Sequence, residues 1–167
     1  MPDPLSQLTE LLRDATRIAV LAVGSPLRAD DGAGLLAAEE LRRLLAGQVT
    51  RPAVEIFVGE TAPENLTGEI RKFAPSHLVI LDAADLDKPP GTLDVIHVEA
   101  ASGGASFSSH ALPIGVLGKY MQATCGCQVT IIGIQPASRT FGQPVGPAVA
   151  AAARQLAARL AEIVGNP

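Results

Sequence analysis

The chain has 167 residues, a formal net charge of −4 and 47% hydrophobic residues, with no tryptophan. This length suits one domain that folds without disulfides. The 13 lysines and arginines form no basic run, which disfavours nucleic acid or an anionic membrane as a partner. No apolar segment approaches the ~20 residues of a membrane-spanning helix, and the N-terminus does not resemble a signal peptide. We therefore expect a cytoplasmic protein that binds neither nucleic acid nor a membrane.

Strands and helices are predicted to alternate along the chain. Apolar runs predict strands at 18–23, 54–58, 78–81 and 129–134, and a partly polar run predicts an edge strand at 92–98. Apolar residues at helical spacing predict helices at 3–15, 31–46, 63–74, 112–124 and from Pro144 onward. This order predicts an α/β fold, a three-layer α/β/α sandwich with a mostly parallel, mixed sheet of five strands. Residues 1–16 would form an N-terminal helical extension, and residues 17–167 a single α/β domain.

Aspartates follow two of the predicted strands. Asp30 and Asp31 lie between the first strand and its helix, and Asp82 directly follows the strand at 78–81. Because ligands bind beyond the carboxyl ends of strands in open α/β sheets, Asp31 and Asp82 are expected to project into one crevice. The alternative is that one aspartate of the pair caps the helix and the other complements its dipole. This alternative carries more weight for Asp30 than for Asp31.

His110 differs from the other two histidines of the chain. His77 precedes a predicted strand and His97 lies within one, so both are expected to be structural. His110 ends the Ser- and Gly-rich loop at 101–110, where a lone histidine is more often a surface residue. Together with Asp31 and Asp82 it would nevertheless make a plausible metal-ligand set, since imidazole suits Zn, Cu, Fe and Ni. Such a set would leave coordination positions open for an outside ligand.

Several familiar motifs are missing. The chain has no GxGxxG, GxxxxGK[ST], GxSxG or HExxH, which disfavours a dinucleotide site, a P-loop, a serine hydrolase and a zinc-protease helix. Cys125 and Cys127 are one residue apart, which is awkward for a disulfide and gives a metal too few ligands. We expect both cysteines to be reduced and structural.

Five ordered segments resemble the [NiFe]-hydrogenase maturation endopeptidases. The first is GSPLRADDGAG, which is similar to the family opening GN-x-L-x-x-DDG-x-G, with Ser25 where the family usually has Asn. The resemblance continues through APENLTGEIR, LDAADLDKPPG, SSHALPI and GIQP, and covers residues 17–164. The APEN and GIQP segments are most similar to the branch that serves hydrogenase 3, formate-linked and energy-converting hydrogenases.

This resemblance implies a peptidase that removes the C-terminal extension of the hydrogenase large-subunit precursor, its expected partner, after nickel insertion. The family's metal-contacting residues correspond to Asp31, Asp82 and His110, and the two aspartates would also be catalytic. The precursor would supply the nickel, and no organic cofactor is expected. Either nickel polarises the scissile carbonyl or activates water, or it only positions the substrate while a carboxylate activates water. The sequence leaves both possibilities open.

Two alternatives belong to other classes of protein. One is a nickel-sensing chaperone without proteolysis. The other, less favoured, is a receiver-like signalling module, which also has an acidic pair after its first strand and an aspartate after its third. A receiver needs a lysine after the fifth strand, where this chain has Gly133-Ile134-Gln135-Pro136. The loop that ends at His110 would have no role in a receiver.

Overall fold

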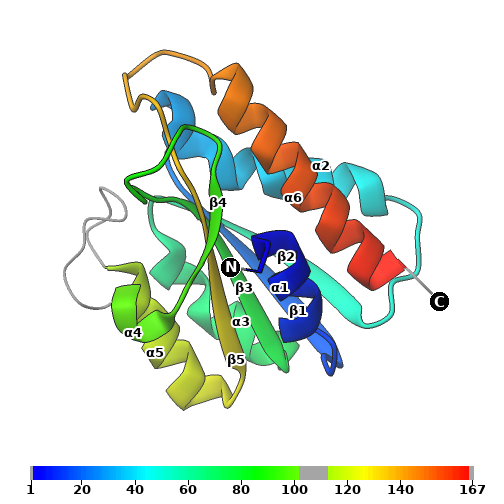
Figure 1. The fold of residues 1–167 in the computed structure, drawn as a ribbon. Helices are drawn as coiled ribbons and strands as arrows, with labels where there is room; N and C mark the ends of the chain where they lie inside the picture. Colours follow the sequence, from blue (N-terminus) through cyan, green and yellow to red (C-terminus); the bar gives the residue numbers. More distant parts are fainter. Residues whose placement is uncertain (1, 102–112, 166–167) are drawn as a thin grey trace.

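The protein contains a five-stranded sheet with helices on both faces (Figure 1). The computed structural model describes residues 2–101 and 113–165. The sheet has the order β2-β1-β3-β5-β4, in which β2, β1, β3 and β5 are parallel and the edge strand β4 is antiparallel to β5. This arrangement confirms the predicted three-layer fold and mixed sheet. The strands are β1 (Arg17–Val23), β2 (Ala53–Glu60), β3 (His77–Ala83), β4 (Leu93–Ile96) and β5 (Gln128–Ile134).

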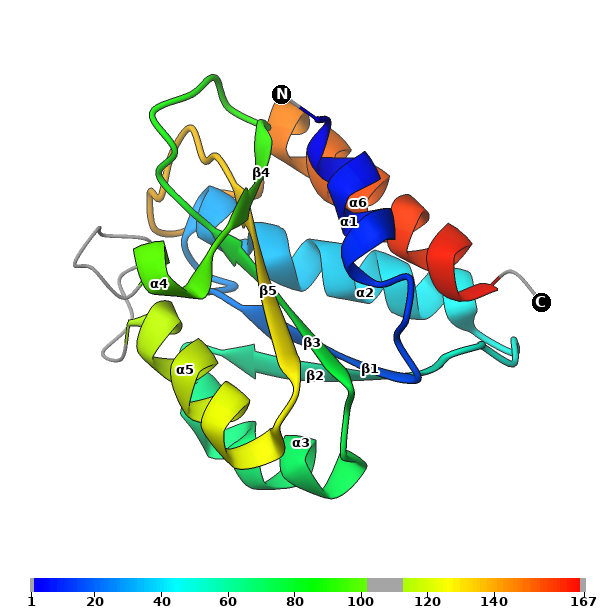
Figure 2. The same ribbon diagram turned by 60° about the horizontal axis from the view of Figure 1, so that its bottom comes forward.

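The helices divide between the two faces of the sheet (Figure 2). One face is covered by α1 (Pro4–Leu11), α2 (Ala33–Leu45) and α6 (Pro147–Gly165), and the other by α3 (Thr67–Phe73), α4 (Val98–Ala101) and α5 (Ile114–Cys125). Alternate residues of each central strand enter the two cores, so that Ile18 and Val20 lie with α2 while Ala19 and Leu21 lie with α5. Burial on both faces explains the continuous apolar runs.

The N-terminal helix α1 contributes to the core beneath α6. Leu8 of α1 and the following Leu12 are buried in the same cluster as the apolar residues of α2 and α6. The division into an extension of residues 1–16 and a domain of residues 17–167 stays a prediction. In the part of the chain that the structure describes, no helix combines the length and apolarity needed to cross a bilayer.

Several element boundaries differ from the prediction, and three of them change the description of a helix start or of His97. The second helix begins at Ala33 rather than at residue 31, because Ala29–Gly32 form a 3-10 turn. Strand β4 ends at Ile96, so that His97 lies beyond the strand and is exposed rather than inside it. The last helix begins at Pro147 rather than near Pro144, consistent with the preference of proline for the first turn of a helix.

Gly34 allows α2 to lie directly on the ends of two strands. A Cβ at this position would overlap the carbonyl oxygen of Leu81 and lie 2.9 Å from that of Val23. A larger residue would therefore separate the helix from the carboxyl ends of β1 and β3. This close approach places Asp31, three residues before Gly34, at the edge of the sheet where Asp82 follows Leu81.

Candidate functional site

The carboxylate of Asp31 is fully buried at the carboxyl edge of the sheet. Its Oδ2 accepts a hydrogen bond from the backbone N–H of Ser25 at 2.9 Å. Its Oδ1 accepts no hydrogen bond from the residues that the structure describes, and it lies 3.5 Å from Nε of Arg139 in an ion pair. Burial of a carboxylate is costly unless the charge is compensated, and the guanidinium supplies that compensation. Among the residues that the structure describes, Arg139 is thus the partner of Asp31 Oδ1.

Asp82 lies at the same edge, on the neighbouring strand β3. It pairs in register with Gly133 of β5 and its side chain is buried. Strand alternation directs its side chain away from the face of Leu81, toward the face covered by α3, α4 and α5. The structure thus brings Asp31 and Asp82 to one edge of two adjacent parallel strands.

His110 lies outside the described residues, as do residues 102–109 of the loop predicted at 101–110, whereas Ala101 ends α4 rather than beginning a loop. The convergence of His110 with Asp31 and Asp82 therefore stays a prediction. Within residues 2–101 and 113–165, no group of three or more His, Cys, Asp or Glu side chains is placed to hold a metal ion.

Asp30 holds a second loop rather than capping a helix. Its Oδ2 accepts hydrogen bonds from the backbone N–H groups of Ala137 (2.8 Å) and Ser138 (3.1 Å), and its Oδ1 accepts one from Gly146 (2.7 Å). Neither Asp30 nor Asp31 caps α2, whose start has no side-chain hydrogen bond. The helix-capping part of the alternative is thus wrong for both residues, and its helix-dipole part stays a prediction. Asp30 instead attaches the loop after β5 to the loop after β1, which brings Arg139 to Asp31.

Gln135 attaches the loop after β3, the third loop at this edge of the sheet, to the end of β5. Its Oε1 accepts hydrogen bonds from the backbone N–H groups of Leu86 (2.6 Å) and Lys88 (3.3 Å), and its Nε2 donates to the carbonyl oxygen of Pro136 at 3.0 Å. The loop that follows Asp82 is thereby fixed to the end of β5. Beside it is a cavity of about 290 Å³ lined by Asp85, Gln135, Pro136, Ala137, Ser138 and Arg139.

The sequence prediction missed Arg139 and the supporting role of Ser25. Arg139 was detectable, because it is the one cationic residue between the end of β5 and the start of α6, at the edge where ligands bind. Ser25, which departs from the family's usual Asn, supports Asp31 through its backbone N–H, and its Oγ accepts a hydrogen bond from the N–H of Leu27 at 3.2 Å. The backbone contact to Asp31 is therefore independent of the departure.

His77 lies at the opposite end of β3 from Asp82. Asp82 is the fifth residue after His77 along the strand, which corresponds to ~16 Å of extended chain. Burial lowers the pKa of His77 below its ordinary value, and Oγ of Ser76 hydrogen-bonds its Nδ1 at 2.8 Å. Since burial favours the neutral imidazole ring, the position of His77 is consistent with the structural role predicted for it.

Cys127 is expected to resist alkylation in the native protein. It is buried, both cysteines are free, and burial raises the pKa of the Cys127 thiol to about 11. Because only the thiolate reacts, iodoacetamide at pH 8 should label Cys127 about 100-fold more slowly than an ordinary free thiol with a pKa of ~8.5. Mass spectrometry of peptides from the labelled native protein checks this rate, with urea-unfolded protein as the control. Equal labelling of Cys127 in both samples would contradict a structural role.

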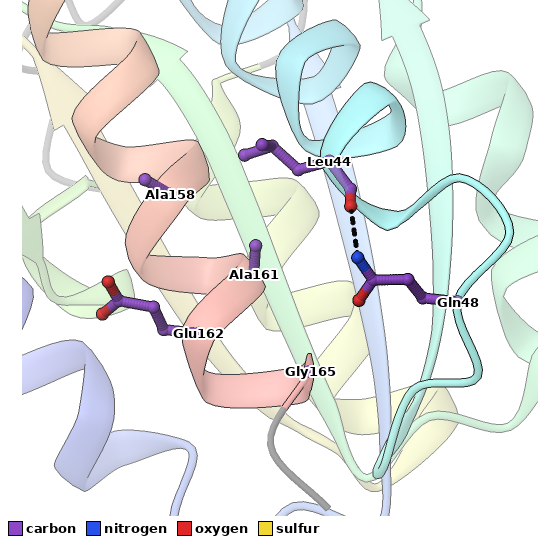
Figure 3. Close-up of a pocket in the computed structure, with 6 residues that line it drawn as sticks. All are labelled: Leu44, Gln48, Ala158, Ala161, Glu162 and Gly165. Atoms are coloured by element: carbon purple, nitrogen blue, oxygen red, sulfur yellow. Dashed lines mark hydrogen bonds between the residues drawn. The ribbon is translucent and has the colours of Figure 1, made fainter.

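A larger hollow lies away from this edge, between α2 and α6 (Figure 3). It measures about 450 Å³, and Gln48 Nε2 donates to the carbonyl oxygen of Leu44 on its wall at 3.0 Å. Leu44 is eleven residues from the start of α2, or ~17 Å along the helix from the aspartates. The lining of this hollow contains one carboxylate, Glu162, and no second titratable side chain. The hollow therefore lacks the paired carboxylates found at the edge of Asp31 and Asp82. The lining comprises Leu44, Gln48, Ala158, Ala161, Glu162 and Gly165.

The fold and the aspartate edge define an α/β protein with a buried carboxylate site at the carboxyl ends of its strands. The model of the HycI hydrogenase maturation protease family matches residues 38–163. The chain is 30% identical over 147 residues to the hydrogenase 3 maturation protease of Escherichia coli strain K12, covering 88% of this chain and 90% of that protein. It is 26% identical over 160 residues to a putative hydrogenase maturation protease of Methanocaldococcus jannaschii, covering 94% of each.

Solved structures similar to this chain are also hydrogenase maturation proteases. The crystal structure of the [NiFe] hydrogenase maturation protease HycI from Thermococcus kodakarensis superposes with a TM-score of 0.86 and 29% identity, covering 96% of this chain and 99% of that one. A crystal structure of the hydrogenase 3 maturation protease superposes with a TM-score of 0.75 and 29% identity, covering 87% and 89%. The chain belongs to the hydrogenase maturation protease family, which confirms the resemblance found in the sequence. This membership disfavours the receiver-like alternative.

Proposed function

We propose that the chain is an endopeptidase that removes a C-terminal extension from the nickel-loaded large-subunit precursor of a [NiFe] hydrogenase. Family membership supports the peptidase class. The observation that carries the proposal for this chain is the buried Asp31 carboxylate, whose Oδ1 accepts no hydrogen bond within the described ranges 2–101 and 113–165. The reaction adds one water across a peptide bond, which leaves a new carboxylate on the large subunit and a new amine on the released peptide.

Nickel belongs to the substrate in this proposal. Asp31, Asp82 and His110 would complete the coordination of a nickel ion that the precursor already holds, since imidazole and carboxylate are both suitable ligands for it. Cleavage would then depend on nickel loading. No organic cofactor is needed for this hydrolysis.

Asp31 and Asp82 are proposed to have different roles in the reaction. A buried carboxylate close to the scissile bond can accept a proton from the attacking water. We assign this role to Asp31 because no described residue donates a hydrogen bond to its Oδ1. Arg139, 3.5 Å from that oxygen, would balance the charge of Asp31 until the metal-bearing substrate arrives. Asp82 would contribute a second ligand from the end of β3.

The direct test compares nickel-loaded and nickel-free precursor incubated with the purified protein, followed by mass measurement of the products. We expect the loaded precursor alone to lose its C-terminal peptide. Equal shortening of the nickel-free precursor would contradict the dependence on nickel. Tight binding of the loaded precursor without shortening would contradict the peptidase and favour a nickel-sensing chaperone.

A further inference from the structure

Two large apolar side chains are exposed on the loops that carry Asp31 and Arg139. Leu27 is 59% exposed and lies four residues before Asp31, and Phe141 is 67% exposed and lies two residues after Arg139. Single exposed hydrophobic residues are normal on a protein surface. This pair is different because its members lie on the two loops that Asp31 and Arg139 join.

The backbones of these two loops are fixed to each other. The N–H of Gly142, next to Phe141, donates to the carbonyl oxygen of Leu27 at 2.8 Å, and the N–H of Ala29 donates to the carbonyl oxygen of Gln143 at 3.1 Å. The three hydrogen bonds to the Asp30 carboxylate join the same loops. The exposed side chains therefore project from a pre-organised support, which lowers the entropic cost of binding a partner.

Positive charge accompanies these apolar side chains although the chain carries a net charge of −4. Arg28 is exposed beside Leu27 and has no ion pair with any residue that the structure describes. Arg139, whose side chain is 32% exposed, lies beside Phe141 in the sequence and also lines the cavity of about 290 Å³. Aromatic residues and arginine are enriched at the energetic centres of protein interfaces. The combination suits a partner that presents an apolar side chain close to an acidic one.

We propose that Leu27, Arg28, Arg139 and Phe141 form a docking surface for the hydrogenase large-subunit precursor, through a segment with apolar and acidic side chains near its cleavage site. This inference rests on the proposed function. The precursor is the expected partner because this surface is continuous with the proposed active site. Arg139 belongs to the surface and also contacts Asp31. A polypeptide whose bond reaches Asp31 Oδ1 must pass over the loops at this edge. The charge of Arg28 selects an acidic partner segment, because the charge of Arg139 is already compensated by Asp31.

The test uses the full chain with Leu27→Ser and Phe141→Ser combined, and separately with Arg28→Glu. The matched control is Val49→Ser, since Val49 is 88% exposed but lies in the loop that enters β2 at the other end of the sheet. Affinity for nickel-loaded precursor is measured by calorimetry, and single-turnover cleavage is followed across enzyme concentrations. Circular dichroism verifies folding.

We expect the double variant to bind the precursor about ten-fold more weakly or worse, with a cleavage rate at saturating enzyme within about two-fold of the wild type. Arg28→Glu should weaken binding in a salt-sensitive manner, and the control should bind normally. Wild-type affinity in both the double variant and Arg28→Glu would overturn the docking surface while leaving the peptidase proposal intact. A wild-type protein that binds but never cleaves would overturn the peptidase proposal, and the affinity measurements would still decide on the surface.

Discussion

Asp31→Asn is expected to lower the cleavage rate of nickel-loaded precursor by about a thousand-fold at saturating enzyme, within the range that a general base contributes. Asparagine keeps an oxygen that can accept the hydrogen bond from Ser25, so the loop can retain its shape. It removes the negative charge that would bind a cation and take a proton from water. Because the loss would lie in the transition state, more enzyme should not restore the rate.

The measurement is single-turnover cleavage across enzyme concentrations, with Asp87→Asn as the matched control. Asp87 is an exposed aspartate of the loop after β3, so the control makes the same chemical change outside the buried site. If nickel only positions the substrate, high concentrations of the Asp31 variant will recover much of the wild-type rate. A wild-type rate at all concentrations would remove Asp31 from the site altogether.

The sequence predicted the elements of the fold better than it predicted the contacts between loops. The strands were found because burial on both faces demands continuous apolar runs, as in Leu78–Leu81. The position of Asp31 and Asp82 at one edge followed from the general rule for parallel sheets. The strand order β2-β1-β3-β5-β4 was not predictable in the same way, because an apolar run does not specify its neighbours.

Asp30 illustrates why the site could be predicted only in part. Local reasoning offered the adjacent helix as one possible partner of its carboxylate, and a capping partner would lie within a few residues. Its true partners are 107, 108 and 116 residues away in the chain. Arg139 was missed for the same reason, since its contact with Asp31 spans two loops that only the folded sheet brings together. Partners of this kind leave no periodic signal in the sequence.

Asp30→Asn is expected to lower the free energy of unfolding by about 3 kcal/mol, because hydrogen bonds to a charged group contribute ~1.5–3 kcal/mol each. The amide oxygen can still accept from Ala137 and Ser138. The amide nitrogen, however, would face the N–H of Gly146 at the position of an oxygen now 2.7 Å away, so that two donors meet. For a chain of this size the melting temperature should fall by about 9 °C.

Thermal unfolding of the Asp30 and Asp31 variants side by side tests whether these neighbouring carboxylates have different roles. Asp31→Asn loses one ion pair at 3.5 Å and keeps the bond from Ser25, so it should cost about 1 kcal/mol of stability while lowering the cleavage rate by about a thousand-fold. Asp30→Asn should be the less stable protein and, where folded, should cleave within about ten-fold of the wild-type rate at saturating enzyme. Its main functional loss should be weaker precursor binding, because the loop that carries Arg139 and Phe141 loses its attachment. An Asp30 variant as stable as the wild type would show that the three hydrogen bonds do not hold that loop.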